Sequence, residues 1–216
     1  MAPRYKKDDR DQALHRTRQL LLDAAAEEFA REGYVGANIN RISRAAGFAK
    51  GTVYNYFPSK QALLEALIDH VAGAHLDYIA QRVEKEIAPD RRLERFFEAG
   101  FGFVSQHLAP AMAIITTLYG PHAAFKMHMY QAYQPMFQFV SQEIVAPGVA
   151  QGVFRDVDPE ATAVLLMNIY LGTGSQVDDS GRPWLDPRQV ADFALHALRE
   201  ENPAPGKERQ ATQTRS

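Results

Sequence analysis

Apolar residues recur at helical spacing along most of the chain, beginning in the first quarter of the sequence. The first such segment predicts a helix over about 15–32, which Gly33 ends because glycine readily adopts the left-handed conformation found just past a helix. Its apolar side holds Leu21, Leu22, Ala25, Ala26 and Phe29, and its polar side holds Asp23, Glu27, Glu28 and Arg31.

Two short helices are expected next, over about 39–46 and 50–57. Asn38 is a favourable N-cap for the first of them, and Gly47 allows the positive φ that a sharp turn between them needs. Pro58 closes the second helix because the residue before a proline is pushed out of the helical region. Ser59 then caps a much longer helix.

The remainder also has a helical pattern, interrupted by proline and glycine. Helices are expected near 90–108, 110–119, 122–146, 158–176 and 186–200, divided by Pro110, Gly120-Pro121, Pro147-Gly148 and the run DDSGRPW. Alternating segments rich in β-branched residues are absent from the sequence, so no strands are predicted. We therefore expect an all-α chain with a flexible arm at 1–14 and a disordered tail at 202–216.

Composition is that of a globular protein, with 46% hydrophobic and 23% charged residues and no cysteine. No apolar run reaches the length of a membrane span, and the first residues lack the apolar core of a signal peptide, so a cytoplasmic location is expected. The net charge of −2 is unevenly spread: residues 1–60 hold 11 Lys and Arg against 7 Asp and Glu, and the rest hold 13 against 19. This imbalance favours an anionic partner for the N-terminal part.

The run GFAKGTVYNYFPSK, residues 47–60, holds two glycines and four aromatics across the turn between the short helices and the second of these helices. Two short helices joined by a glycine-containing turn form a helix-turn-helix, whose second helix enters the DNA major groove. The outer face of that helix would carry Lys50, Thr52, Asn55 and Tyr56, while Phe57 points into the core. The apolar residues expected to fix the angle between the two short helices, called the apolar pins below, are Ile42, Ala46, Phe48 and Val53.

The segment GANINRISRAAGFAKGTVYNYFPSKQALLEAL resembles the DNA-binding segment of TetR-family transcriptional regulators. Their pattern is a capped I-x-x-x-A-G turn, then G-T-hydrophobic-Y-x-[HY]-F-x-x-K and a long helix. The resemblance covers about 16–67, a quarter to a third of the chain, and it is specific because several spaced positions agree together. Those positions are Ile42, Ala46, Gly47, Gly51, Tyr54, Phe57 and Lys60.

The resemblance implies a DNA-binding domain at 15–60 and an effector-binding and dimerisation domain at 61–201. It implies phosphate contacts from Tyr54, Tyr56 and Lys60, and base contacts from Asn40, Lys50, Thr52 and Asn55, with Arg41 and Arg44 available to either. Two positions depart from the family pattern. Ala49 replaces a frequent serine that caps the recognition helix, at a cost of about 1 kcal/mol, and Tyr56 replaces a frequent histidine. Taken singly, Tyr54 and Phe57 are equally consistent with core aromatics, and Lys60 with a solvated helix start.

The last two helices are suited to pairing with a second copy, because short recognition helices read two half-sites from a dimer. The helix near 158–176 is apolar on more than one face, and the last helix carries one apolar stripe. Together with the resemblance, this predicts a homodimer rather than burial of both helices within one subunit. The expected interface residues are Leu165, Asn168, Ile169, Gly172, Phe193, Ala194, Ala197 and Leu198.

Aromatic residues and methionines gather between residues 95 and 139, where the resemblance implies a pocket for an apolar effector. Such a stripe is more often simply core, and both interpretations stay open from the sequence. The expected lining is Phe97, Phe101, His107, Met112, Tyr119, His122, Phe125, Met129, Tyr133, Met136 and Phe137.

No catalytic, metal or cofactor motif is recognisable. The spacings His70–His75 and His122–His128 do not put both rings on one helix face, and no nucleotide-binding or nucleophile-elbow pattern occurs. Together with the resemblance, the sequence predicts a homodimeric DNA-binding transcriptional regulator. The resemblance implies that it is a repressor released from a palindromic operator by a small apolar effector. The alternatives are an activator or architectural DNA binder without an effector, and an all-α carrier or enzyme with an incidental helix-turn-helix.

Overall fold

The computed structural model describes residues 5–120, 123–178, 180 and 182–199, and its described residues are arranged in helices without a strand. A bridge between Val177 and Pro183 is the one isolated β-contact found in the described part of the chain. The elements are α1 (Tyr5–Gly36), α2 (Ile39–Ala45), α3 (Lys50–Tyr56), α4 (Lys60–Val83), α5 (Pro89–Gln106), α6 (Leu108–Leu118), α7 (Ala123–Phe139), the π-helix η1 (Val140–Val145), α8 (Ala146–Ala150), α9 (Pro159–Gly174) and α10 (Pro187–Leu198).

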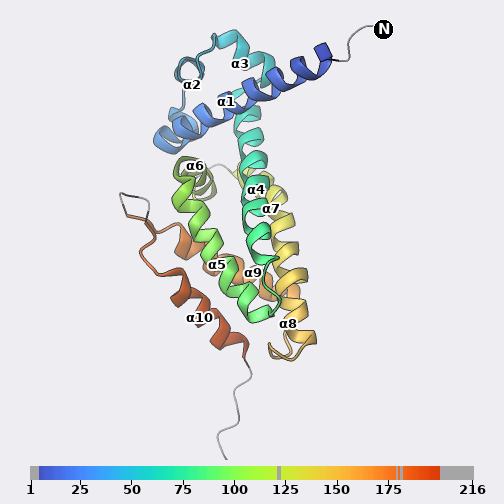
Figure 1. Cartoon of the computed structure of the whole chain (residues 1–216). Helices are drawn as coiled ribbons and strands as arrows, with labels where there is room; N and C mark the ends of the chain where they lie inside the picture. The colour runs from blue at the N-terminus through green and yellow to red at the C-terminus, as the bar shows by residue number, and fades with distance from the viewer. Residues whose placement is uncertain (1–4, 121–122, 179, 181, 200–216) are drawn as a thin grey trace, which may run out of the picture.

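Helix α1 lies across one end of the molecule, with α2 and α3 above it and the remaining helices below (Figure 1). α4 starts beside the short helices and runs down into the bundle, where it packs on α5 and α7. α1 also packs against α6, so the first helix joins the helix-turn-helix end to the remaining helices. The predicted all-α fold is confirmed.

The short helices begin and end close to where the sequence signals predicted. The Asn38 side chain accepts a hydrogen bond from the Asn40 N–H at the start of α2, and the Ser59 side chain accepts one from the Ala62 N–H at the start of α4. Gly33 has φ 64°, which breaks the regular geometry of α1 where a helix stop was expected.

Two boundaries differ from the prediction. α1 begins at Tyr5, so most of the segment expected to be a flexible arm is helical; residues 9–16 are exposed, and an established helix extends at little cost per residue. Pro147 does not divide the chain, because α7 continues through η1 into α8, which contains Pro147. Pro110 likewise lies in the first turns of α6. The predicted disordered tail lies outside the described residues.

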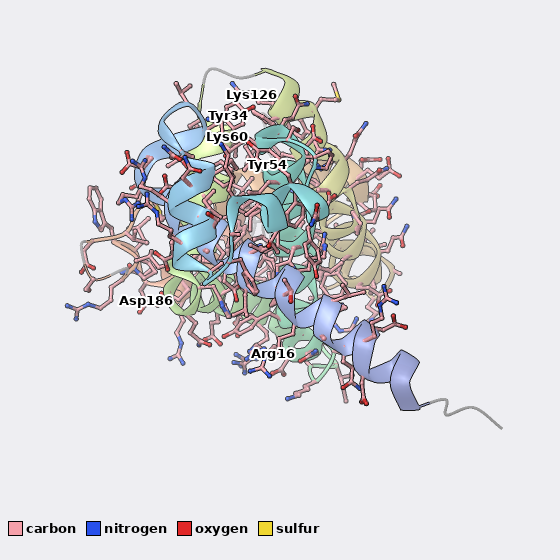
Figure 2. All side chains as sticks on the ribbon, turned by 90° about the horizontal axis from the view of Figure 1, so that it is seen from above. Arg16, Tyr34, Tyr54, Lys60, Lys126 and Asp186 are labelled. Atoms are coloured by element: carbon pink, nitrogen blue, oxygen red, sulfur yellow. The ribbon has the colours of Figure 1, made fainter. Side chains whose placement is uncertain are left out.

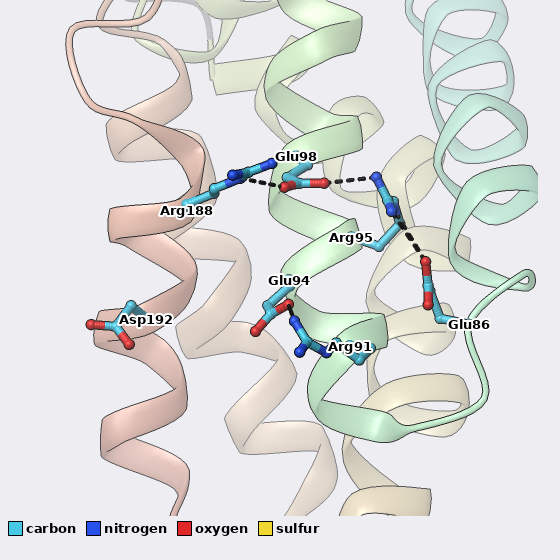
Figure 3. Close-up of a pocket in the computed structure, with 7 residues that line it drawn as sticks. All are labelled: Glu86, Arg91, Glu94, Arg95, Glu98, Arg188 and Asp192. Carbon is cyan, nitrogen blue, oxygen red and sulfur yellow. Dashed lines mark hydrogen bonds and ion pairs between the residues drawn. The ribbon is translucent and has the colours of Figure 1, made fainter.

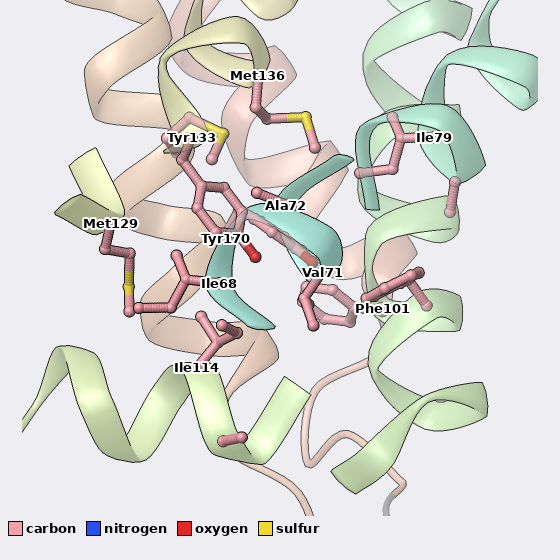
Figure 4. Close-up of a cluster of buried hydrophobic side chains, with 14 of the residues drawn as sticks. Ile68, Val71, Ala72, Ile79, Phe101, Ile114, Met129, Tyr133, Met136 and Tyr170 are labelled. Carbon is pink, nitrogen blue, oxygen red and sulfur yellow. The ribbon is translucent and has the colours of Figure 1, made fainter. Parts of the chain in front are cut away.

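One hydrophobic core extends from α1 to α10, and Figure 4 shows its part around α4, α7 and α9. In its lower part, side chains of α4, α5, α7 and α9 meet around Tyr170, which is 2% exposed. Gly100 on α5 allows this tyrosine to approach, since a Cβ built there would lie 2.5 Å from Tyr170 Cε2.

Gly100→Ala is therefore expected to destabilise the protein by about 1–3 kcal/mol, because the added methyl overpacks the core and displaces the Tyr170 ring. Urea-induced unfolding measures the change. Gly73→Ala on α4 is the matched control: no atom lies within 4 Å of its added Cβ, so stability should rise by about 0.5–1 kcal/mol. Equal effects of both substitutions would contradict this packing.

Candidate nucleic-acid interface and effector cavities

The helix-turn-helix is built from α2, α3 and the turn between them. Gly47 has φ 79°, and the turn closes with hydrogen bonds from Gly47 N to Arg44 O (3.1 Å) and from Phe48 N to Ser43 O (2.8 Å). Ile42 and Val53 are buried, and Ala46 and Phe48 pack partly buried against the same core, as expected of the apolar pins. Ala49 makes no side-chain cap bond, so α3 begins without one.

The outer face of α3 carries the predicted contact residues of this helix. Lys50, Tyr54 and Asn55 are exposed, and Thr52 and Tyr56 are half-buried. The Lys50 ammonium lies 5.8 Å from the centre of the Tyr54 ring, so a cation and a phenol are presented together. Phe57, in contrast, is 3% exposed, which confirms its place in the core.

On α2, Asn40 and Arg44 lie beside this face and are exposed. The Arg44 Nε donates to Asn40 O over 3.1 Å, which orients the guanidinium and leaves its remaining N–H groups toward solvent. These donors have the chemistry that binds phosphates and base edges.

Arg41 and Lys60 are held by atoms of this chain instead. Arg41 donates to Glu28 (2.7 Å) and to Gly36 O (3.0 Å). Lys60 Nζ donates to Val35 O and Ala37 O, each over 3.1 Å, and lies 4.8 Å from the Tyr34 ring centre, beside which Figure 2 shows it. Both cations therefore fix the loop that precedes α2, and their predicted DNA contacts stay predictions.

Glu28 is a buried carboxylate that links α1 to α2, whereas the sequence pattern placed it wrongly on the solvent side of the first helix. Its side chain is 3% exposed and accepts hydrogen bonds from the Asn38 N–H (2.8 Å), from Arg41 and from Arg31. This carboxylate joins α1 to the start of α2. Helical spacing alone could not identify this role, because the partners on the α2 side, Asn38 and Arg41, lie 10 and 13 residues further along the chain.

The residues predicted to line an effector pocket are divided between core and surface. Phe97, Phe101, Phe125, Met129, Tyr133 and Met136 are buried among other side chains of the core. Met112 is half-buried on α6, Tyr119 and Phe137 line an open groove, and His107 lies at the corner between α5 and α6. His122 lies outside the described residues.

A buried polar cluster that sequence reasoning missed lies beside a small cavity in this core. His75 on α4 is 4% exposed; its Nε2 lies 2.8 Å from the Tyr170 hydroxyl and its Nδ1 lies 3.5 Å from the Tyr133 hydroxyl. The Tyr170 hydroxyl donates to Gly100 O over 3.1 Å. The cavity measures about 30 Å³, and all three side chains line it. These are hydrogen-bonding groups of the kind that orient a ligand in an apolar pocket.

Burial sets the ionisation of this cluster. It lowers the pKa of His75 to about 3, with a smaller contribution from His107, and it raises the pKa of both tyrosine hydroxyls. The cluster is therefore uncharged at neutral pH. Because the unfolded chain binds a proton at this histidine below about pH 6.5 and the folded chain does not, acidification favours unfolding.

We expect His75 to reduce the free energy of unfolding by up to about 1.4 kcal/mol per pH unit as pH falls from about 6 to 4. His75→Phe keeps an aromatic ring but cannot titrate, so its stability should fall less steeply over the same interval. Urea unfolding at several pH values measures both slopes. The exposed His196→Phe serves as the control, and an unchanged slope in His75→Phe would contradict a neutral buried histidine.

A groove of about 710 Å³ runs along α7 and α9 and is wide enough for an organic ligand. Its lining mixes apolar and amide side chains with Lys126 and Glu160. The residues are Leu118, Tyr119, Lys126, Tyr130, Gln134, Phe137, Gln138, Ser141, Gln142, Glu160, Val164, Asn168 and Leu171. Leu171 also lines the small cavity beside His75, so groove and cavity share this side chain.

A charged depression of about 630 Å³ lies between α5 and α10 (Figure 3). Glu98 forms ion pairs with Arg188 at 2.9 Å and with Arg95 at 2.7 Å. Arg95 also pairs with Glu86. Arg91 binds Glu94 at 2.6 Å. Because each of these arginines already has a carboxylate partner, the depression serves to join α10 to α5.

The predicted dimer residues lie partly on an open face of α9 and α10. Leu165 and Phe193 are 65% and 68% exposed, and Asn168 and Ala197 are exposed too, with Ile169 and Gly172 half-buried. Ala194 and Leu198 are 0% and 5% exposed and pack in the core of their own subunit, so little of either side chain is available to a second copy.

Within the described residues, no individual helix has both the length and the apolar character of a membrane span. Helices α5 and α6 satisfy those criteria only as a pair, and they meet at a bend of 103°.

Residues 21–67 match the family model of bacterial regulatory proteins, tetR family. The HTH-type transcriptional repressor NicS of Pseudomonas putida is 28% identical over 150 residues, which are 68% of this chain and 70% of the repressor. The matched segment of the family model spans the helix-turn-helix and the start of α4.

Two solved structures show the same fold. The transcriptional regulator FadR from Bacillus subtilis, in complex with stearoyl-CoA, has a TM-score of 0.73 at 18% identity, over 83% of this chain and 96% of that one. AibR in complex with isovaleryl coenzyme A and operator DNA has a TM-score of 0.64 at 22% identity, over 84% of this chain and 97% of that one.

Proposed function

Because this chain belongs to the TetR family of DNA-binding transcriptional regulators, we propose that it is a homodimeric repressor released from a palindromic operator by a small apolar effector. The observation that carries the proposal is the exposed face of α3, where Lys50, Tyr54 and Asn55 stand clear of the core. The DNA-binding domain comprises residues 15–60, and residues 61–201 form the effector-binding and dimerisation domain.

We assign the polar contacts with DNA to the predicted residues according to whether their side chains are exposed or already paired within the chain. Lys50, Arg44, Tyr54 and Tyr56 supply phosphate or base contacts directly, and Asn40, Thr52 and Asn55 supply base contacts. Lys60 and Arg41 act mainly by holding the loop before α2, since their cationic groups already have partners in this chain.

Removing exposed cations should weaken binding to all duplexes and reduce its salt dependence. In Lys50→Ala or Arg44→Ala, the slope of log affinity against log salt should fall by about 1. Fluorescence anisotropy over a salt series measures it. Lys85→Ala, an exposed lysine between α4 and α5, is the control and should leave the slope unchanged. Unchanged slopes in both test variants would contradict this assignment.

The effector site comprises the small cavity beside His75 and the groove along α7 and α9, which share Leu171 as a lining residue. The apolar lining suits an acyl chain or an aromatic compound, and the structures similar to this chain include regulators bound to stearoyl-CoA and isovaleryl coenzyme A. Lys126 is the one cation among the described lining residues of the groove, which favours an apolar moiety there over a polyphosphate.

Effector binding releases the operator if it favours a conformation with a different spacing between the two recognition helices. α4 is the connecting element, because it carries His75 and begins directly after α3.

A panel of fatty acids, acyl-CoA thioesters and flat aromatic compounds, added to the protein–operator complex, tests this part. At least one class should dissociate the complex in the wild type and lose potency in His75→Phe. If no compound in the panel dissociates the protein–operator complex, an architectural DNA binder without an effector would be favoured.

A further inference from the structure

A separate cavity lies where the helix-turn-helix end of the molecule meets the bundle. It measures about 300 Å³ and opens between α1, α4 and the corner between α5 and α6. Figure 1 shows α6 directly beneath α1 at this junction. The walls are Gln19, Asp23 and Ala26 of α1; Leu67, His70, Val71, Ala74 and Tyr78 of α4; and Phe103, His107 and Pro110. We refer to it as the junction cavity.

One end of the junction cavity is aromatic. The ring centres of Phe103 and His107 are 4.6 Å apart, those of Tyr78 and Phe103 are 5.6 Å apart, and those of Tyr78 and His107 are 6.1 Å apart. The Tyr78 ring meets both others nearly at right angles, with interplanar angles of 70° and 86°. Such a corner of ring faces and edges accommodates a flat ring or a cation.

The other end is polar and carries negative charge. Gln19 Nε2 lies 3.0 Å from Asp23 Oδ1 and 3.0 Å from His70 Nε2, and so bridges the carboxylate to the imidazole. Burial lowers the pKa of His70, which keeps that ring neutral at physiological pH. Among the described lining residues, Asp23 is the one carboxylate.

A neighbouring cation fixes the orientation of any charged ligand. The guanidinium of Arg82 lies 3.4 Å from the centre of the Tyr78 ring, so positive charge already occupies that ring. A second cation is repelled there and attracted at the Asp23 end. We infer that the junction cavity binds a small aromatic ammonium compound, with its nitrogen toward Asp23 and its ring against Phe103 and His107.

Such a ligand contacts both parts of the regulator. Gln19, Asp23 and Ala26 belong to α1, whose end bears the loop leading to α2, and the other walls belong to the bundle. Phe103 also lines the small cavity beside His75 and stacks on His75, with ring centres 4.3 Å apart and an interplanar angle of 14°. Phe103 is thus a shared wall, through which ligands in the two cavities influence one another's affinity.

The test is direct binding of benzylammonium to the full-length protein, which needs no DNA and no known effector. Two control compounds have nearly the same shape as benzylammonium: benzyl alcohol is uncharged, and benzoate is negatively charged. NMR signals of the His70 and His107 rings should shift and saturate with benzylammonium, while those of His196 on α10 stay unchanged. Benzyl alcohol should bind more weakly, and benzoate should not saturate.

Two variants separate this site from adventitious binding. Asp23→Asn should weaken benzylammonium binding about three- to tenfold by removing the charge, and Ala74→Leu should abolish it by filling the cavity. Asp156→Asn, an exposed aspartate elsewhere, is the matched control. Absence of saturable binding, or equal affinity in the wild type, Asp23→Asn and Ala74→Leu, would overturn the inference.

Discussion

Replacing Leu165 and Phe193 together by aspartate is expected to convert the protein to a monomer and to lower its operator affinity at least about 100-fold. Both side chains are about two-thirds exposed in the isolated subunit, so their apolar surface is available to a second copy. Two aspartates on each copy would place four desolvated charges in the interface, whereas folding of the subunit should change little.

Size-exclusion chromatography with light scattering measures the first effect. The wild type should have twice the chain mass of 24.2 kDa, and the double variant the single mass. Anisotropy with the operator measures the second effect. Ile87→Asp, at an apolar side chain that is 92% exposed in the connection before α5, is the control. A double variant that remains a dimer would show that the pairing face lies elsewhere.

The second large effect is expected at Glu28. Glu28→Ala removes the acceptor for the Asn38 N–H and the carboxylate that binds Arg41 and Arg31, and so detaches the start of α2 from α1. We expect a loss of about 2–3 kcal/mol in the free energy of unfolding, since both arginines remain partly exposed and keep water as a partner. Operator affinity should fall as well, because α2 orients the recognition helix.

The neighbouring residue supplies a matched control for this substitution. Glu27→Ala removes an exposed carboxylate one position away and should change stability by less than about 0.5 kcal/mol. Glu28→Gln retains an acceptor for Asn38 and should have an intermediate effect. Urea unfolding compares the three variants, and similar stabilities for Glu28→Ala and Glu27→Ala would refute the role assigned to the buried carboxylate.

Local signals allowed the helix-turn-helix to be predicted closely from the sequence. Asn38, Gly47, Pro58 and Ser59 each act through their own backbone or that of the next few residues, so their effects can be inferred without a fold. The extension of α1 to Tyr5 was not predictable in this way, because residues 9–16 bury no apolar face that a hydrophobic pattern could reveal.

Long-range contacts account for the rest of what sequence reasoning missed. The role of Glu28 depends on Asn38 and Arg41, and that of His75 depends on Tyr133 and Tyr170, up to 95 residues away. Of the predicted effector residues, Tyr133 lines the cavity beside His75, and most of the buried aromatics serve as core. Residue type could not separate those two roles, because the same side chains suit both.

The central claim is that this chain reads two half-sites as a homodimer. Selection of bound duplexes from a random DNA pool by the full-length protein, followed by sequencing, tests it most directly. We predict enrichment of an inverted repeat whose half-sites lie about one helical turn apart, near 34–36 Å. A pool that never enriches, or one that yields only a single unrepeated half-site, would contradict the account.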